Sequence, residues 1–181
     1  MNHANKRFTD LPPEIQRSLA TPINAVPLPD PTNSNLESSR IYIGNLSAAL
    51  DLPTLQANNI MYVIQVLEQD WSPFKNDGLV YLPIIVEDSP TVDLMPFFQP
   101  AVRFVEKALS ASTHPGNVLI HCQMGASRSG TILIAVLMAR LRIGRDKALV
   151  MAREARPCVE PNEAFWRQLG EWEMQLGLLF S

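Results

Sequence analysis

Residues 117–137 read NVLIHCQMGASRSGTILIAVL, and this stretch predicts a strand, a tight loop and a helix in direct succession. Asn117 to His121 is a short, largely apolar run of the kind that forms a buried strand. Ser129 to Arg142 is a longer apolar run, which indicates a buried helix. The loop between them is expected at a helix N-terminus, where backbone N–H groups and the helix dipole together bind anions.

The residues of this loop suit a phosphate group. Gly125 permits a backbone conformation that a bulkier residue would strain. Arg128 follows Cys122 with five residues between them, so a curled loop can bring the guanidinium and the sulfur to opposite sides of one phosphate. The guanidinium can then bind phosphate oxygens through charge-assisted bidentate hydrogen bonds. We therefore expect the phosphate to be bound by Gln123, Met124, Gly125, Ala126, Ser127 and Arg128.

Cys122 is the expected nucleophile. An electropositive loop at a helix N-terminus favours the thiolate, which is the reactive form of cysteine. In-line attack on phosphorus would give a phosphocysteine that is hydrolysed in a second step. Ser129 can donate a hydrogen bond to the sulfur and so help it leave in that step. His121 is expected to orient the loop through hydrogen bonds of its ring.

Other common sites do not fit these residues. No Gly-Lys-Ser/Thr follows the glycine, as a nucleotide-binding P-loop would require, and no second cysteine stands where a thioredoxin-like site needs one. The histidines and the two cysteines share no ligand spacing, so we expect no metal. Cys158, the second cysteine, is expected to be a buried small apolar residue, with a disulfide to Cys122 under oxidation as the alternative.

The rest of the chain alternates strand and helix patterns. β-Branched apolar runs at Ile60 to Leu67 and Leu79 to Val86 predict strands buried on both faces. A shorter strand is expected at 41–43, and helices at about 92–112, 145–156 and 162–176. Gly144 is expected to end the preceding helix in a left-handed conformation. This alternation predicts an α/β fold, with a central, mostly parallel β-sheet flanked by helices.

Residues 1–39 differ from the remainder, 40–181, which is the expected catalytic domain. They form a Pro-rich N-terminal extension with few large apolar side chains, carrying Pro12, Pro13, Pro22, Pro27, Pro29 and Pro31. Because proline fixes φ and removes a donor, this extension is predicted to be extended or partly disordered. It is interpreted either as a solvated tail or as a docking arm for a partner, with Lys6 and Arg7 ahead of apolar residues.

Length and charge limit the classes of protein. The chain has 181 residues, enough for one domain with a hydrophobic core. The net charge of −3 argues against a nucleic-acid partner, because no broad basic excess is present. No secretory signal and no run long enough for a membrane span are found, and only two cysteines occur. These features predict a cytoplasmic protein, with a nuclear share equally allowed.

The signature His121-Cys122, a five-residue gap, Arg128 and Ser129 resembles that of the dual-specificity branch of the protein tyrosine phosphatase superfamily. The likeness covers roughly residues 39–176 and includes Arg156-Pro157 with Pro161-Asn162, which is similar to the family's closing motif. It implies a protein tyrosine phosphatase-like fold of the dual-specificity type. It also implies catalysis without a metal or organic cofactor, and a phosphorylated protein as substrate.

The resemblance further implies a general acid on a loop upstream of the cysteine. From the residues alone, Glu87, Asp88 and Asp93 all remain candidates. By resemblance, Asp88 stands in the acid position, and Asp93 is expected to cap the following helix.

The expected function is therefore a protein phosphatase that hydrolyses phosphotyrosine and phosphoserine or phosphothreonine through a phosphocysteine on Cys122. One alternative is a phosphatase of a phospholipid, glycan or nucleotide, although the loop contains no lysine. The other alternative is a phospho-binding scaffold with little activity, against which the intact Cys122 and Arg128 argue.

Overall fold

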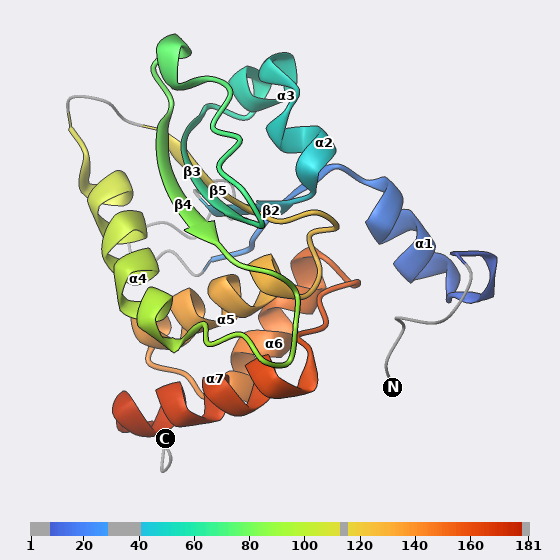
Figure 1. Ribbon diagram of the computed structural model, residues 1–181, viewed down its shortest axis with the longest axis vertical. Helices are drawn as coiled ribbons and strands as arrows, with labels where there is room; N and C mark the ends of the chain where they lie inside the picture. Colours follow the sequence, from blue (N-terminus) through green and yellow to red (C-terminus); the bar gives the residue numbers. More distant parts are fainter. Residues whose placement is uncertain (1–7, 29–40, 113–115, 179–181) are drawn as a thin grey trace.

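A five-stranded mixed sheet forms the centre of the computed structural model, which describes residues 8–28, 41–112 and 116–178 (Figure 1). The strand order is β1-β2-β5-β3-β4. The strands are β1 (Ile23–Ala25), β2 (Ile41–Gly44), β3 (Ile60–Leu67), β4 (Val80–Ile85) and β5 (Asn117–His121). The pairs β2–β5, β5–β3 and β3–β4 are parallel, and only the short β1 runs antiparallel to its neighbour β2. The predicted mostly parallel sheet is confirmed.

Helices cover both faces of this sheet (Figure 1). The large layer contains α4 (Met95–Ser110), α5 (Arg128–Leu141), α6 (Arg145–Ala155) and α7 (Glu163–Gln175), and the small layer contains α2 (Leu46–Ala49) and α3 (Leu52–Ala57). Successive side chains of β5 alternate between the layers, as a strand requires. Val118 and Ile120 join the large core, whereas Leu119 packs with Leu55 and Ala49 in the small one. The α/β fold predicted from the alternating pattern is therefore confirmed.

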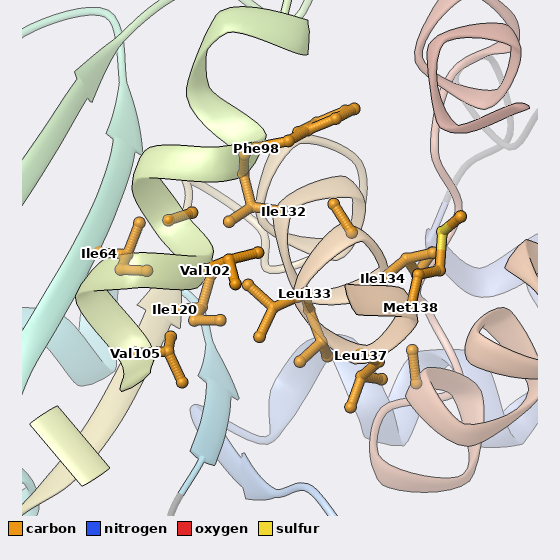
Figure 2. Packing of buried hydrophobic residues seen from close by; sticks show 14 of the residues in the cluster. Ile64, Phe98, Val102, Val105, Ile120, Ile132, Leu133, Ile134, Leu137 and Met138 are labelled. Atoms are coloured by element: carbon orange, nitrogen blue, oxygen red, sulfur yellow. The ribbon is translucent and has the colours of Figure 1, made fainter. Parts of the chain in front are cut away.

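Helix α5 is the centre of the large layer. Every residue from Arg128 to Met138 is buried, because α5 lies between the sheet on one side and the other helices on the other. Figure 2 shows Leu133 and Leu137 of α5 among side chains of the same cluster that come from α4 and β5. This packing fixes the start of α5, and with it the loop that precedes the helix.

Truncation of a core residue of α5 should therefore be costly. We expect Leu133→Ala to lower the free energy of unfolding by about 2–5 kcal/mol, because it leaves a cavity at a fully buried position. Val150→Ala on the exposed side of α6 is the matched control, with an expected change of about 0.5 kcal/mol or less. Urea unfolding measures both values. Equal effects of the two substitutions would contradict the packing described here.

Two expectations about the ends and edges of elements are wrong. Strand β4 is not buried on both faces, since Val80 is 47% and Ile85 57% exposed. The reason is its place at the end of the strand order, which the residue pattern does not reveal. Gly144 does not take the left-handed conformation; Arg142 does so, with φ 55°, while Gly144 has φ −66° and precedes α6.

The N-terminal extension was predicted to be extended or partly disordered, and for its described part, residues 8–28, the prediction of a merely extended segment is wrong. Pro13–Ala20 forms the helix α1, and Ile23–Ala25 forms β1 of the central sheet. Pro12 and Pro13 start the helix rather than prevent it, because the first helical turn needs no intrahelical N–H donors. Residues 1–7 and 29–40, including the arm at Lys6 and Arg7, lie outside the described residues.

Among the described residues, no helix combines the length and the apolar character that a bilayer crossing requires.

Candidate active site

The candidate site lies at the carboxyl edge of the parallel strands. Cys122 follows β5, Glu68 follows β3, and Asp88 lies shortly after β4. Because β5, β3 and β4 are parallel neighbours, their carboxyl ends meet at one edge of the sheet. The topology thus brings together three side chains that are far apart in the sequence.

The sulfur of Cys122 is held by two hydrogen-bond donors. The backbone N–H of Gly125 donates to Sγ at 3.2 Å, and the hydroxyl of Ser129 donates to it at 3.1 Å. The side chain is 2% exposed, so few water molecules compete with these donors. Hydrogen bonds to a sulfur stabilise its anionic form. The predicted contact between Ser129 and Cys122 is therefore present.

Gly125 gives the loop its curl. Its φ of +72° lies in the left-handed region, which other residues enter at a cost. A Cβ at this position would lie 2.5 Å from the carbonyl oxygen of Gly44 and 2.7 Å from Nε of Arg156. Both the backbone conformation and the close neighbours thus require glycine, as the sequence predicts.

The guanidinium of Arg128 is buried beside the loop and already oriented. Nη1 donates to the carbonyl oxygen of Val86 at 3.1 Å and to Oε1 of Glu68 at 3.2 Å. Nε is buried, and among the described residues it has no hydrogen-bond partner. A buried donor without a partner is costly, and a tetrahedral oxyanion in the loop would supply the missing acceptor. The arrangement therefore suits the phosphate binding expected of Arg128.

The carboxylate of Asp88 lies against the same loop. Its Oδ1 accepts a hydrogen bond from the Ser127 hydroxyl at 2.8 Å and another from Nδ2 of Asn162 at 3.0 Å. Its Oδ2 lies 3.9 Å from Nε of Arg128. Of the three acidic candidates, Asp88 thus has direct contacts with the loop, and its role as the acid stays a prediction.

The other two acidic candidates show no such contacts with the loop among the described residues. Oδ1 of Asp93 accepts a hydrogen bond from the backbone N–H of Met95 at 3.0 Å, at the first residue of α4. Asp93 precedes Leu94, the N-cap residue of α4, so its capping role stays a prediction. Glu87 is exposed.

His121 does not orient the loop in the way predicted. Its ring is buried, and among the described residues neither ring nitrogen has a partner with hydrogen-bond geometry. Burial lowers the pKa of His121 from 6.5 to about 4, and an interaction with the Cys122 backbone opposes this shift. The ring is therefore neutral at pH 7.

This burial predicts a loss of stability in acid. The unfolded chain binds a proton on His121 near pH 6.5, whereas the native protein binds it only near pH 4. The free energy of unfolding should therefore fall as the pH drops from 6.5 to 4, by about 3 kcal/mol from this residue. Urea unfolding of the wild type and of His121→Gln across this range measures the difference. The same pH dependence in both proteins would contradict the assignment.

Three residues at the site were not predicted from the sequence. Glu68 contacts Arg128, Asn162 contacts Asp88, and Arg156 donates to the carbonyl oxygens of Met124 and Gly125. Arg156 and Asn162 belong to the stretch that resembles the family's closing motif, so that motif was the available signal. Glu68 had none.

Cys158 is buried, as predicted, and packs behind the loop, with its Sγ 3.8 Å from the carbonyl oxygen of Gly125. Both cysteines are free thiols. Within residues 8–28, 41–112 and 116–178, no cluster of three His, Cys, Asp or Glu side chains could hold a metal ion.

Comparison with known proteins places these features in a family. The family model described as the catalytic domain of dual specificity phosphatases matches residues 41–175. A probable dual specificity protein phosphatase of Dictyostelium discoideum is 38% identical over 135 residues, which cover 75% of this chain and 33% of that protein. The dual specificity protein phosphatase Mpk3 of Drosophila melanogaster is 37% identical over 139 residues, covering 76% and 33%.

Solved structures give the same result. A mouse putative dual specificity phosphatase, in complex with zinc tungstate, superposes with a TM-score of 0.71 at 30% identity, covering 86% of this chain and 88% of that one. The chain spans about a third of the length of the two curated relatives, with 33% of each covered. The similarity to these larger proteins is therefore confined to the region of the catalytic domain.

Proposed function

The chain belongs to the dual specificity phosphatase family, and on this premise we propose that it hydrolyses phosphotyrosine and phosphoserine or phosphothreonine in proteins. The observation that carries the proposal is the geometry around Cys122. Its sulfur has two donors, while the buried Nε of Arg128 lacks an acceptor among the described residues and Asp88 lies beside the loop.

In the proposed first step, the thiolate of Cys122 attacks phosphorus in line with the ester oxygen. A P–S bond forms as the P–O bond to the substrate breaks. Asp88, in its protonated form, gives its proton to the leaving oxygen. Ser127 and Asn162 both bind Oδ1, so Oδ2 is the oxygen we assign to proton transfer. Arg128 and the backbone N–H groups of the loop stabilise the charge on the transferred phosphoryl group.

In the proposed second step, water hydrolyses the phosphocysteine. The carboxylate of Asp88 takes a proton from the water as its oxygen attacks phosphorus. The P–S bond breaks, and the sulfur leaves as a thiolate that Ser129 and the N–H of Gly125 stabilise. Inorganic phosphate is released, and no redox change or added reactant other than water is needed.

A substrate panel tests the proposed specificity. The wild type is assayed on peptides phosphorylated on tyrosine, serine or threonine, and on a phosphoinositide, a phosphorylated glycan and a nucleoside monophosphate. We expect all three peptides to be hydrolysed with a higher kcat/KM than the other compounds. A preference for one of the non-protein substrates would overturn the proposed substrate class but not the phosphatase chemistry.

Vanadate binding, measured together with hydrolysis, distinguishes an enzyme from a phospho-binding scaffold. The complex of the mouse relative with zinc tungstate makes a tetrahedral oxyanion a suitable probe for this chain. We expect vanadate to inhibit the wild type competitively. A wild type that binds vanadate but hydrolyses no phosphoester would contradict the proposed activity.

Location in the cytoplasm or nucleus stays a prediction from the sequence.

A further inference from the structure

Arg156 is a buried cation that the chemistry above does not use. It is the largest of the fully buried side chains, with 0% exposed. None of the ion pairs within the described residues includes it. A buried charge is destabilising unless its hydrogen-bonding groups are satisfied. The position of this guanidinium therefore depends on the neutral acceptors around it.

Those acceptors come from two separate parts of the chain. On the side of the loop, Nε donates to the carbonyl oxygen of Gly125 at 2.9 Å, and Nη2 donates to that of Met124 at 3.0 Å. On the other side, Nη1 donates to the carbonyl oxygen of Thr21 at 2.8 Å and to Oδ1 of Asn24 at 2.7 Å. One planar guanidinium thus connects the phosphate loop to the N-terminal segment.

The contact with Met124 has a direct consequence for the nucleophile. The carbonyl of Met124 and the N–H of Gly125 belong to one peptide group, and they point in opposite directions. The carbonyl oxygen faces Arg156, and the N–H faces Sγ of Cys122 at 3.2 Å. Arg156 therefore fixes the orientation of a donor to the sulfur. A cation on the oxygen also polarises the peptide group and strengthens this N–H as a donor.

The N-terminal side of this arrangement is itself held in place. Strand β1 pairs with β2, and the carbonyl oxygen of Pro22 accepts a hydrogen bond from the N–H of Asn45 at 2.9 Å. The hydroxyl of Ser18 accepts a hydrogen bond from the backbone N–H of Cys158 at 3.1 Å. All of the N-terminal acceptors precede residue 41, where the match to the family begins.

We propose that Arg156, together with the Thr21 carbonyl and Asn24, positions the Met124–Gly125 peptide and thereby stabilises the thiolate of Cys122. These are positioning residues, because none of them contacts the reacting atoms. The N-terminal segment outside the family match is then part of the machinery that makes the cysteine reactive. This inference rests on the proposed function only in taking Cys122 as the nucleophile.

Asn24→Ala in the full chain is the primary test, since it removes one acceptor and leaves Arg156 in place. We expect kcat/KM for an aryl phosphate to fall about tenfold, and Arg156→Lys to lower it about 100-fold, as a small misplacement of reacting groups does. Asn24→Asp keeps the acceptor and should retain activity. Glu14→Ala, at an exposed position in the first turn of α1 and outside the contacts of Arg156, is the control and should leave activity unchanged.

A second measurement separates positioning from stability. The rate of alkylation of Cys122 by iodoacetamide is followed against pH by mass spectrometry of its peptide, on protein shown by circular dichroism to be folded. We expect the midpoint of this profile to move to higher pH in Asn24→Ala and Arg156→Lys. The inference would be overturned by a folded Asn24→Ala variant that keeps the wild-type alkylation profile and kcat/KM. It would equally be overturned if the only change in this variant were a lower free energy of unfolding.

The outcomes also separate this inference from the proposed function. A wild type without phosphatase activity, whose alkylation profile still moves in Asn24→Ala, would refute the function and support the positioning role. An active wild type with an unmoved profile would refute the positioning role alone.

Discussion

Cys122→Ser is expected to lower kcat for an aryl phosphate by roughly 10⁴-fold or more, the scale on which loss of an enzymatic nucleophile acts. A serine hydroxyl stays protonated at neutral pH, so the donors from Gly125 and Ser129 no longer face an anion. The substituted side chain is nearly the same size, and the loop should keep its shape. Steady-state kinetics and vanadate binding, measured together, test this expectation.

Cys158→Ser is the matched control for this substitution. It also replaces a buried free thiol, but one that packs behind the loop. We expect it to retain most of the activity. Comparable losses in the two variants would show that a buried thiol matters for folding rather than for chemistry at Cys122. Full activity of Cys122→Ser would refute the nucleophile outright.

Arg128→Lys is expected to have the second-largest effect, a loss of about 10²–10³ in kcat/KM. Lysine keeps the positive charge but cannot donate two parallel hydrogen bonds to one phosphate. It also cannot reproduce the contacts of Nη1 with Glu68 and the Val86 carbonyl while leaving a second nitrogen for the substrate. Steady-state kinetics with the aryl phosphate give the size of the loss.

Arg140→Lys, at the far end of α5, is the control for this change of residue type and should leave kcat/KM unchanged. The affinity for vanadate should fall in parallel with kcat/KM in Arg128→Lys, because both depend on hydrogen bonds from the guanidinium to an oxyanion. An Arg128→Lys variant with wild-type kcat/KM would contradict the role assigned to the guanidinium.

The loop could be predicted from the sequence because its chemistry is local. Cys122, Gly125, Arg128 and Ser129 lie within one short stretch between a strand and a helix, so their spacing alone indicates their arrangement. The strands β3 and β5 were predicted with their observed ends, because they are buried on both faces and read as continuous apolar runs.

The features that the sequence did not reveal depend on long-range contacts. Arg156 reaches acceptors 31 to 135 positions away, and hydropathy does not distinguish it from a surface arginine. The edge position of β4 follows from the order of the strands, which hydropathy does not encode. For α1, the prolines were interpreted as breakers, although the same residues also suit the first turn of a helix.

The residue that holds the phosphate loop through hydrogen bonds is Arg156 rather than the expected His121. His121 is adjacent to the nucleophile in the sequence and was expected to hold the loop, yet its ring is buried without a hydrogen-bond partner among the described residues. Arg156, which is remote in the sequence, donates to two carbonyl oxygens of the loop instead. Proximity along the chain therefore predicted Ser129 as a donor to the sulfur, but it did not predict which residue binds the carbonyl oxygens of the loop.

The central claim is that catalysis proceeds through a phosphocysteine on Cys122, and the most direct test is to trap it. The Asp88→Ala variant is mixed with an aryl phosphate whose leaving group needs no protonation, quenched in acid and digested for mass spectrometry. Without the base for the second step, the intermediate should accumulate, and one phosphoryl group should be found on the peptide that contains Cys122. Turnover without any phosphoryl group on that peptide, or with the group on another residue, would contradict the account.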